Sequence, residues 1–158
     1  MTGVRAFVAL GSNLGDRETA LRRAVEGLRG LPRTHVRRVS TFRDTEPVGI
    51  REQPRFLNGA VELETELLPR ELLEGLLEIE RSLGRDRSAV LPGGPRTADL
   101  DLVLYGAAEI AEPGLEVPHP RLHERRFVLE PLAELDPGLD VPGRGKVETL
   151  LAKLDSAP

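Results

Sequence analysis

The residues best suited to chemistry are Asp99 and Asp101, two positions apart in a segment whose pattern predicts a β-strand over residues 98–105. Side chains of a strand alternate between its faces, so both carboxylates are expected on one face and the leucines on the other. Two residues advance about 6.5–7 Å along a strand, which places the carboxylates side by side. That separation suits oxygen ligands of one hard cation, or of two cations about 4 Å apart. The apolar positions alternating with them are Ala98, Leu100, Leu102 and Leu104.

Arg96 lies just before this pair, on a Gly-Pro-containing entry to the strand. A fixed guanidinium beside two carboxylates could hold Mg²⁺ and an anionic phosphate together. A second interpretation is that Asp-x-Asp is only the solvated face of a half-buried strand. The spacing by itself leaves both interpretations open.

Several other phosphate-handling and hydrolytic motifs are absent from the sequence. It contains no Gly-x-x-x-x-Gly-Lys-Ser/Thr loop, no dinucleotide-binding glycine fingerprint and no Gly-x-Ser-x-Gly elbow. The chemistry left to the chain is an acidic pair combined with basic side chains, the parts that phosphoryl transfer needs. The candidates for holding phosphate are Arg85, Arg87, Arg96, Arg121, Arg125 and His119.

These basic residues also have structural interpretations. Arg121 and Arg125 could form surface ion pairs with Glu124 or Glu130. Arg85 and Arg87 follow a predicted helix end, where the helix dipole favours cations. His119, which stands between two prolines, could fix a turn through backbone hydrogen bonds.

The composition is that of a globular protein without disulfides. The chain has 158 residues, 39% hydrophobic and 30% charged, and no cysteine, which excludes a thiolate metal site and a cysteine nucleophile. Its net charge of −4 does not favour a nucleic-acid surface, and no apolar run is long enough to span a bilayer. We therefore expect one domain over residues 1–158, a cytoplasmic monomer without nucleic-acid or membrane partners.

The order of expected elements predicts an α+β fold. It matches a ferredoxin-like βαββαβ sheet covered by helices, with a C-terminal helical addition. The helices are expected on one sheet face, leaving the other for long loops and a ligand. The predicted strands cover residues 4–10, 36–42, 57–67 and 98–105; the helices follow Asp16 up to Gly30, run from Pro69 to Gly84, and cover 121–129 and 147–154; the loops cover 44–56 and 85–97.

Several blocks of sequence together resemble the 6-hydroxymethyl-7,8-dihydropterin pyrophosphokinase family of folate biosynthesis. The most specific are Pro95-Arg96-Thr97-Ala98-Asp99-Leu100-Asp101 and Pro118-His119-Pro120-Arg121. The others, in order, are Ala9-Leu10-Gly11-Ser12-Asn13-Leu14-Gly15, Thr45-Glu46-Pro47-Val48-Gly49, Phe56-Leu57-Asn58-Gly59-Ala60-Val61, Ile79-Glu80 and Gly84-Arg85.

The resemblance implies transfer of pyrophosphate from ATP to the hydroxymethyl oxygen of the pterin, with AMP leaving. It implies that Asp99 and Asp101 hold two Mg²⁺ ions and that Arg85 and Arg96 stabilise charge on the transferring phosphates. The residues implied for ATP are Arg87, His119, Arg125 and the backbone near Leu102. Those implied for the pterin are Thr45, Val48, Phe56, Asn58 and Phe127.

This chain departs from the family pattern in the predicted loop over residues 85–97. Members often carry an Arg-Trp pair before Gly-Pro-Arg, where this chain has Leu91-Pro92-Gly93. No dedicated general base is evident, although Asp99 could assist the hydroxyl. Two alternatives remain from the residues alone: a metal-dependent phosphohydrolase using the acidic pair, and a non-enzymatic ferredoxin-like ligand-binding domain.

Overall fold

The computed structural model describes residues 3–13, 15–45, 56–88 and 98–156, and for 85–88 it describes the backbone only. Its central sheet has the strand order β2-β4-β1-β5, with every neighbouring pair antiparallel. This is the order of a ferredoxin-like α+β fold, so the predicted fold class is confirmed. The strands are β1 (Val4–Ser12), β2 (Thr34–Val39), β4 (Phe56–Thr65) and β5 (Asp99–Tyr105).

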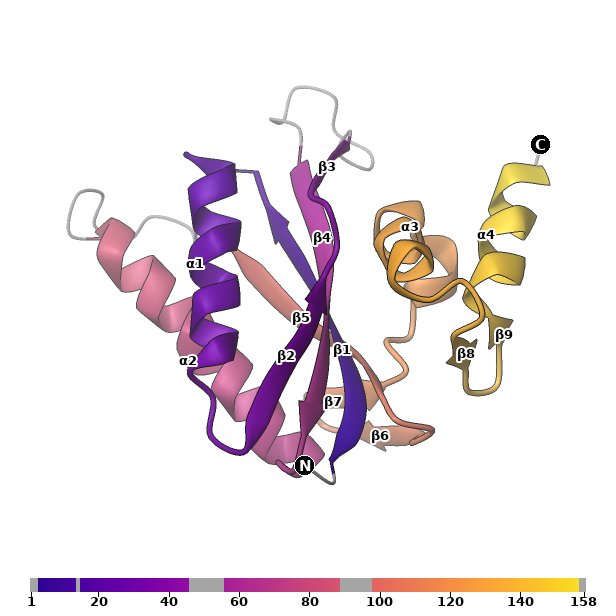
Figure 1. Ribbon diagram of the computed structural model, residues 1–158, viewed down its shortest axis with the longest axis horizontal. Coiled ribbons are helices and arrows are strands. Elements are labelled where there is room, and N and C mark those ends of the chain that lie inside the picture. The colour runs from indigo at the N-terminus through magenta and orange to yellow at the C-terminus, as the bar shows by residue number, and fades with distance from the viewer. Residues whose placement is uncertain (1–2, 14, 46–55, 89–97, 157–158) are drawn as a thin grey trace.

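Two long helices cover one face of this sheet (Figure 1). Helix α1 (Arg17–Arg29) begins where Asp16 accepts a hydrogen bond from the Thr19 backbone N–H, and Gly30 follows its last turn, as predicted. Helix α2 (Pro69–Ser88) packs beside it. Their apolar stripes and the inward side chains of the strands form one core cluster, which includes Leu21, Leu28, Leu72, Leu76, Leu10 and Leu63.

The opposite sheet face is also partly covered, which corrects the expectation of an open face. Helix α3 (Arg126–Leu135) packs on β4, and α4 (Val147–Ser156) packs on α3 (Figure 1). Leu129 and Leu132 are fully buried in this second cluster. Apart from the short strand β3 (Arg43–Thr45), the remaining elements of the described residues are the 3₁₀ turn η1 (Leu122–Glu124) and two small hairpins, β6 (Ile110–Glu112) with β7 (Leu115–Val117) and β8 (Asp140–Val141) with β9 (Gly145–Lys146).

The predicted ends of two helices are wrong. Helix α2 runs past Gly84 to Ser88, so residues 85–88 are helical rather than loop. A glycine inside a helix costs only about 1 kcal/mol, and the burial of Ile79 and Leu83 offsets it. The predicted helix over 121–129 is interrupted at Arg125, which has extended backbone, and α3 then continues through Pro131 to Leu135. Burial of Leu132 and Leu135 outweighs the one helical hydrogen bond that the proline cannot donate.

Two strand predictions also need correction. Leu104 lies in the second core cluster, whereas Leu100 and Leu102 lie in the first, because the β1–β5 register shifts between Phe7 and Val8. An irregularity of this kind inserts a residue and reverses the alternation beyond it. The predicted second strand begins and ends earlier, and residues 43–45, mostly assigned to a loop, form a separate strand β3 (Arg43–Thr45) that pairs with the start of β4.

Candidate active site

Four strands place part of the predicted site on one face of the sheet. Opposite Asp99 and Asp101 on β5 lie Gly11 and Ala9 on β1. Gly11 in turn pairs with Asn58 on β4, which pairs with Arg43 on β3. Directly paired residues of an antiparallel sheet point to the same face, so the acidic pair and Asn58 face the same side, two strand spacings or about 10 Å apart.

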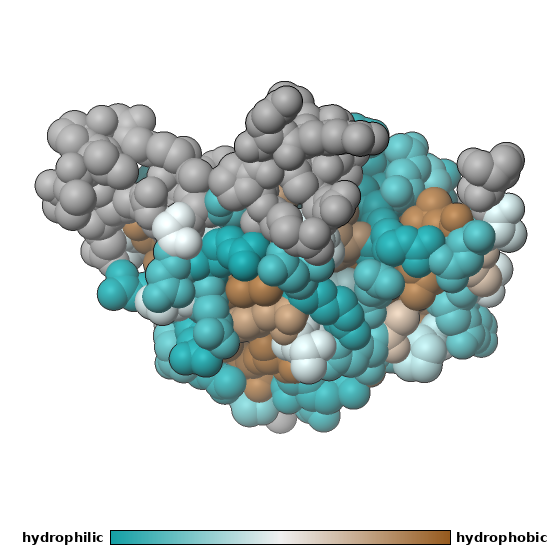
Figure 2. All heavy atoms as spheres, turned by 90° about the horizontal axis from the view of Figure 1, so that it is seen from above, coloured by the Kyte–Doolittle hydropathy of each residue, from teal (hydrophilic) through white to brown (hydrophobic). Residues whose placement is uncertain are grey.

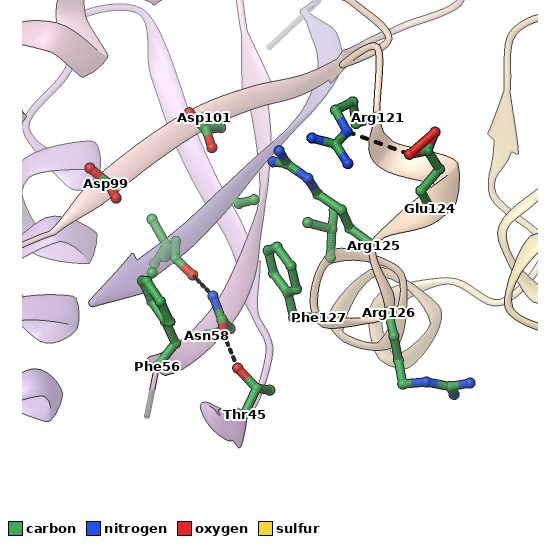
Figure 3. A pocket seen from close by; sticks show the side chains of 14 residues that line it. Thr45, Phe56, Asn58, Asp99, Asp101, Arg121, Glu124, Arg125, Arg126 and Phe127 are labelled. Carbon is green, nitrogen blue, oxygen red and sulfur yellow. Dashed lines mark hydrogen bonds and ion pairs between the residues drawn. The ribbon is translucent and has the colours of Figure 1, made fainter. Parts of the chain in front are cut away.

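The small side chains of β1 leave a hollow between these two groups. A pocket of about 740 Å³ opens there, lined on one side by Asp99 and Asp101 and on the other by Thr45, Phe56 and Asn58. Figure 3 shows Phe127 projecting into this space from the start of α3. We call this the first pocket; its volume is within the range of small-molecule sites, and Phe56 and Phe127 in its lining could stack on a flat ligand.

Asn58 is fixed at the floor of the first pocket by two hydrogen bonds. Its amide oxygen accepts from the Thr45 hydroxyl at 2.6 Å, and its Nδ2 donates to the Leu10 carbonyl oxygen at 3.4 Å. The side chain is 6% exposed. These partners fix the amide orientation, so Asn58 is the kind of pre-oriented polar group that reads the edge of a heterocycle.

The position opposite Asn58 requires glycine. A Cβ built on Gly11 would lie 2.9 Å from Asn58 Nδ2. The resemblance implies a pterin as the ligand of this pocket; on that expectation, Gly11→Ala should displace the Asn58 amide, break its bond to Leu10 and weaken pterin binding about tenfold. Pterin fluorescence measures the affinity directly, since the chain has no tryptophan. Gly138→Ala is the control, because a Cβ there meets only Asp136 at 3.8 Å; equal affinities of Gly11→Ala and wild type would contradict the prediction.

Basic side chains approach the acidic pair from η1 and the start of α3. Figure 3 shows the side chains of Arg121 and Arg125 extending toward β5, whereas Arg126 extends away. Arg125 lies over the Phe127 ring, 5.7 Å from its centroid. Arg121 pairs with Glu124 at 3.4 Å, one of the surface ion pairs that the sequence suggested, and Arg126 pairs with Asp155 on α4. Arg121 and Arg125 are therefore placed to meet phosphate oxygens near the carboxylates.

A second pocket, of about 510 Å³, shares both carboxylates with the first. It lies on the outer side of β5, and its other walls come from α2, β7 and the His119 segment. Leu102 and His119, both predicted for ATP, line it, as do Leu73 and Leu77 of α2. The acidic pair thus stands between two pockets, one on each side of β5.

His119 is held against β5. Its backbone N–H donates to the Val103 carbonyl oxygen at 3.0 Å, and its Nδ1 accepts from the Arg121 backbone N–H at 3.3 Å. Burial lowers the pKa of His119, and the nearby Asp101 carboxylate only partly opposes this. The imidazole is therefore neutral at pH 7, and with Nδ1 accepting, its proton sits on Nε2.

This pKa shift predicts a pH dependence of stability. Below the ordinary pKa of about 6.5 the unfolded chain binds a proton that the folded chain resists, so stability falls from there down to the lowered folded value. Urea unfolding at several pH values between 7.5 and 5 measures this decrease in the free energy of unfolding. We expect the decrease to be smaller in His119→Asn, which lacks the titrating imidazole. The exposed His35→Asn variant should keep it. An unchanged profile in His119→Asn would contradict the assignment.

Glu80 is a buried carboxylate whose structural role sequence reasoning did not identify. It is 4% exposed, and its Oε2 accepts from the Leu100 backbone N–H at 2.6 Å. Since β5 is an edge strand of the sheet as far as the described residues form it, this N–H between the two aspartates has no strand partner among them on that side. Glu80 thereby anchors α2 to the backbone that carries the acidic pair.

Some predicted site residues fall outside the described residues. Val48 and Arg96 do so entirely, as do the side chains of Arg85 and Arg87. The structure brings the other predicted residues to the two pockets: Asp99, Asp101, Leu102, His119, Arg125, Thr45, Phe56, Asn58 and Phe127. It adds the Ala9–Gly11 hollow and the Arg121 side chain, which the sequence suggested only as a phosphate ligand or a surface ion pair.

The acidic pair is chemically suited to magnesium. Both side chains are exposed at the pocket surface, and no cluster of three or more metal-ligating side chains occurs in the described parts of the chain. Two carboxylates with room for further oxygen ligands are the donor set typical of Mg²⁺ bound together with substrate phosphates. None of the described helices is long and apolar enough to cross a membrane.

An α+β sheet with an acidic pair between two ligand-sized pockets is typical of an enzyme that acts on small molecules. The 7,8-dihydro-6-hydroxymethylpterin-pyrophosphokinase (HPPK) family matches residues 7–137, so the chain belongs to that family. It is a pyrophosphokinase of folate biosynthesis.

Individual proteins similar to this chain carry the name of the same enzyme. A Bacillus subtilis 2-amino-4-hydroxy-6-hydroxymethyldihydropteridine pyrophosphokinase is 52% identical over 130 residues, which are 82% of this chain and 77% of that protein. A Pseudomonas aeruginosa protein of the same name is 43% identical over 148 residues, covering 94% of this chain and 90% of its own length. Among solved structures, a Plasmodium falciparum HPPK-DHPS resembles the fold with a TM-score of 0.76 at 12% identity, over 96% of this chain and 45% of that one.

Proposed function

We propose that the acidic pair carries the transfer of pyrophosphate from ATP to the hydroxymethyl group of 6-hydroxymethyl-7,8-dihydropterin. The observation that supports this most strongly is the position of Asp99 and Asp101, which line both pockets at once. A pterin in the first pocket and a triphosphate reaching in from the second would meet at these carboxylates. Bringing two reactants together in this way is a large part of phosphoryl-transfer catalysis.

In this proposal the first pocket binds the pterin. Phe56 and Phe127 stack on the ring, while Asn58, held by Thr45, reads its polar edge. This orientation directs the hydroxymethyl group toward the acidic pair. Val48 is proposed for the same pocket from the resemblance alone.

The second pocket binds ATP. The adenine lies against apolar side chains near Leu102, and His119 donates its Nε2 proton to the nucleotide. Arg125 meets the phosphates from the side of the first pocket. Arg87, Arg85 and Arg96 are proposed from the resemblance to bind or neutralise the phosphates.

Asp99 and Asp101 would hold two Mg²⁺ ions, which when bound neutralise the triphosphate and favour ionisation of the attacking hydroxyl. The hydroxymethyl oxygen then forms a bond to the β-phosphorus, and the bond from that phosphorus to the oxygen of the α-phosphate breaks. AMP leaves with both electrons of that bond, and the hydroxyl proton passes to water at this exposed edge of the sheet.

A binding titration tests the assignment without turnover. We expect wild-type protein to bind an ATP analogue with a methylene group between its α- and β-phosphorus atoms in a Mg²⁺-dependent manner. Asp99→Asn/Asp101→Asn should lower that affinity at least about tenfold and leave pterin fluorescence binding within about twofold. Metal-dependent nucleotide binding of wild-type strength in the double variant would contradict the proposal.

A further inference from the structure

Strand β3 is three residues long, yet each of its side chains is tied to a different element. Arg43 pairs with Glu134 on α3, Asp44 with Arg17 on α1, and Thr45 with Asn58 on β4. We propose that Arg43 and Asp44 are positioning residues for the first pocket, holding β3 so that Thr45 keeps Asn58 in place. This inference rests on the proposed pterin site, and it assigns to that site two side chains absent from the pocket lining.

We call the Asp44–Arg17 ion pair the tether to α1 and the Arg43–Glu134 ion pair the tether to α3. The tether to α1 is bidentate. Arg17 Nη1 and Nη2 donate to the two carboxylate oxygens of Asp44, each at 3.2 Å. A bidentate pair of this kind restrains orientation as well as distance. Arg17 is the first residue of α1, directly after the N-cap Asp16, whose carboxylate accepts from the Thr19 N–H and hydroxyl. The anchor on the α1 side is therefore itself held in place.

The tether to α3 comes from the opposite face of the sheet, because Arg43 and Asp44 are neighbours on a strand. Arg43 Nη2 lies 2.9 Å from Glu134 Oε1. The same carboxylate accepts from the Thr41 backbone N–H at 3.0 Å and from its hydroxyl at 2.7 Å. Partial burial would raise the pKa of Glu134, but these hydrogen bonds and Arg43 outweigh it and lower the pKa, so the acceptor is charged at pH 7.

Both tethers act on β3, and the Arg43–Glu134 pair joins β3 to a second wall of the first pocket. Helix α3 carries Phe127 as well as Glu134, and β3 carries Thr45. The Arg43–Glu134 pair thus sets the distance between the stacking wall and the polar floor, while Asp44–Arg17 prevents β3 from lifting off. Within the described residues β3 pairs only with β4, over three residues, so its own ladder restrains it weakly.

These contacts are poorly suited to a role in overall stability. The side chains of Arg17 and Asp44 are 29% and 47% exposed, and exposed ion pairs contribute little to folding. A small displacement of a binding group, by contrast, has a large effect on affinity. The inference therefore predicts an effect on pterin binding that is out of proportion to the effect on unfolding.

Charge reversal tests this. We expect Asp44→Arg, which faces Arg17 with a like charge, to raise the KM for the pterin about three- to tenfold, with the KM for ATP within about twofold of wild type. The double variant Asp44→Arg/Arg17→Asp restores an opposite-charge pair and should recover most of the pterin KM. Glu134→Gln keeps one acceptor oxygen for Thr41 but loses the charge facing Arg43, and should raise the same KM to a smaller extent.

The control is Glu26→Arg, which breaks the exposed Glu26–Arg29 pair at the other end of α1 from Arg17 and should leave both KM values unchanged. A lower melting temperature with an unchanged pterin KM in Asp44→Arg would show a merely structural pair and overturn the inference. Equal rises in both KM values, or no recovery in the double variant, would also overturn it. If wild-type protein bound no pterin at all, the proposed function itself would fail, which is a distinct result.

Discussion

Replacing Asp99 or Asp101 by alanine is expected to abolish turnover, a loss of at least about 10³-fold in kcat. The physical reason is electrostatic: without either carboxylate the site loses a ligand for the cations that offset the negative charge of the transferring phosphates. Both side chains are exposed, so the free energy of unfolding should change by less than about 1 kcal/mol. Steady-state kinetics measures the loss of kcat, and urea unfolding of the same variants measures the change in the free energy of unfolding.

Asparagine at the same positions is the matched control for side-chain shape. Asp101→Asn keeps the size and one oxygen, and should remain as inactive as Asp101→Ala because the charge is what the site requires. A ligand-binding domain with a solvated acidic face would behave differently, since its pterin and nucleotide binding would survive both changes. Full turnover in Asp99→Ala or Asp101→Ala would refute the assignment of the acidic pair.

The second large effect is expected at Glu80. Glu80→Ala should lower the free energy of unfolding by about 2–3 kcal/mol, because the Leu100 N–H loses its buried acceptor. Activity should fall as well, since that N–H lies between the two aspartates on an edge strand. Glu80→Gln keeps an acceptor oxygen and should recover most of the stability.

Glu78→Ala is the control on the same helix. Glu78 forms an exposed pair with Arg81, and its loss should cost well under about 1 kcal/mol. If Glu80→Ala were as stable and as active as Glu78→Ala, the anchoring of β5 by Glu80 would be wrong. If Glu80→Gln were as impaired as Glu80→Ala, the negative charge rather than the hydrogen bond would be the important feature.

The fold was predictable where the sequence pattern is regular over many residues. The apolar run of β1, the N-cap and stripe of α1 and the alternation in β4 each identify one element, and their order predicts the βαββαβ arrangement. Strand β3 was not predictable, because three residues give no period and its position depends on side-chain contacts with α1, α3 and β4. The shift at Leu104 was hidden for a similar reason, since a β-bulge leaves no mark in a run of apolar residues.

Two helix ends were predicted wrongly because the burial of apolar side chains outweighed a helix-breaking residue. Gly84 and Pro131 each suggest a helix end, but Leu83 and Leu132 beside them are buried in the two cores. The energy of packing is set by the tertiary structure, which the local sequence does not contain.

The candidate site, too, was predictable only in part. The acidic pair could be predicted because its own spacing places both carboxylates on one face. The hollow over β1 could not, because Ala9 and Gly11 carry no chemistry and matter only through their register with Asp101, Asp99 and Asn58. The roles of Arg85, Arg87, Arg96 and Val48 rest on the resemblance and stay predictions.

The most direct test of pyrophosphoryl transfer at the acidic pair is the identity of the nucleotide product. Protein, ATP, Mg²⁺ and 6-hydroxymethyl-7,8-dihydropterin are mixed, and the nucleotides are separated by anion-exchange chromatography. We predict AMP, formed only when the pterin is present and in equal amount to the pterin pyrophosphate, and none with Asp101→Ala. ADP as the product, or AMP formed without the pterin, would contradict this account.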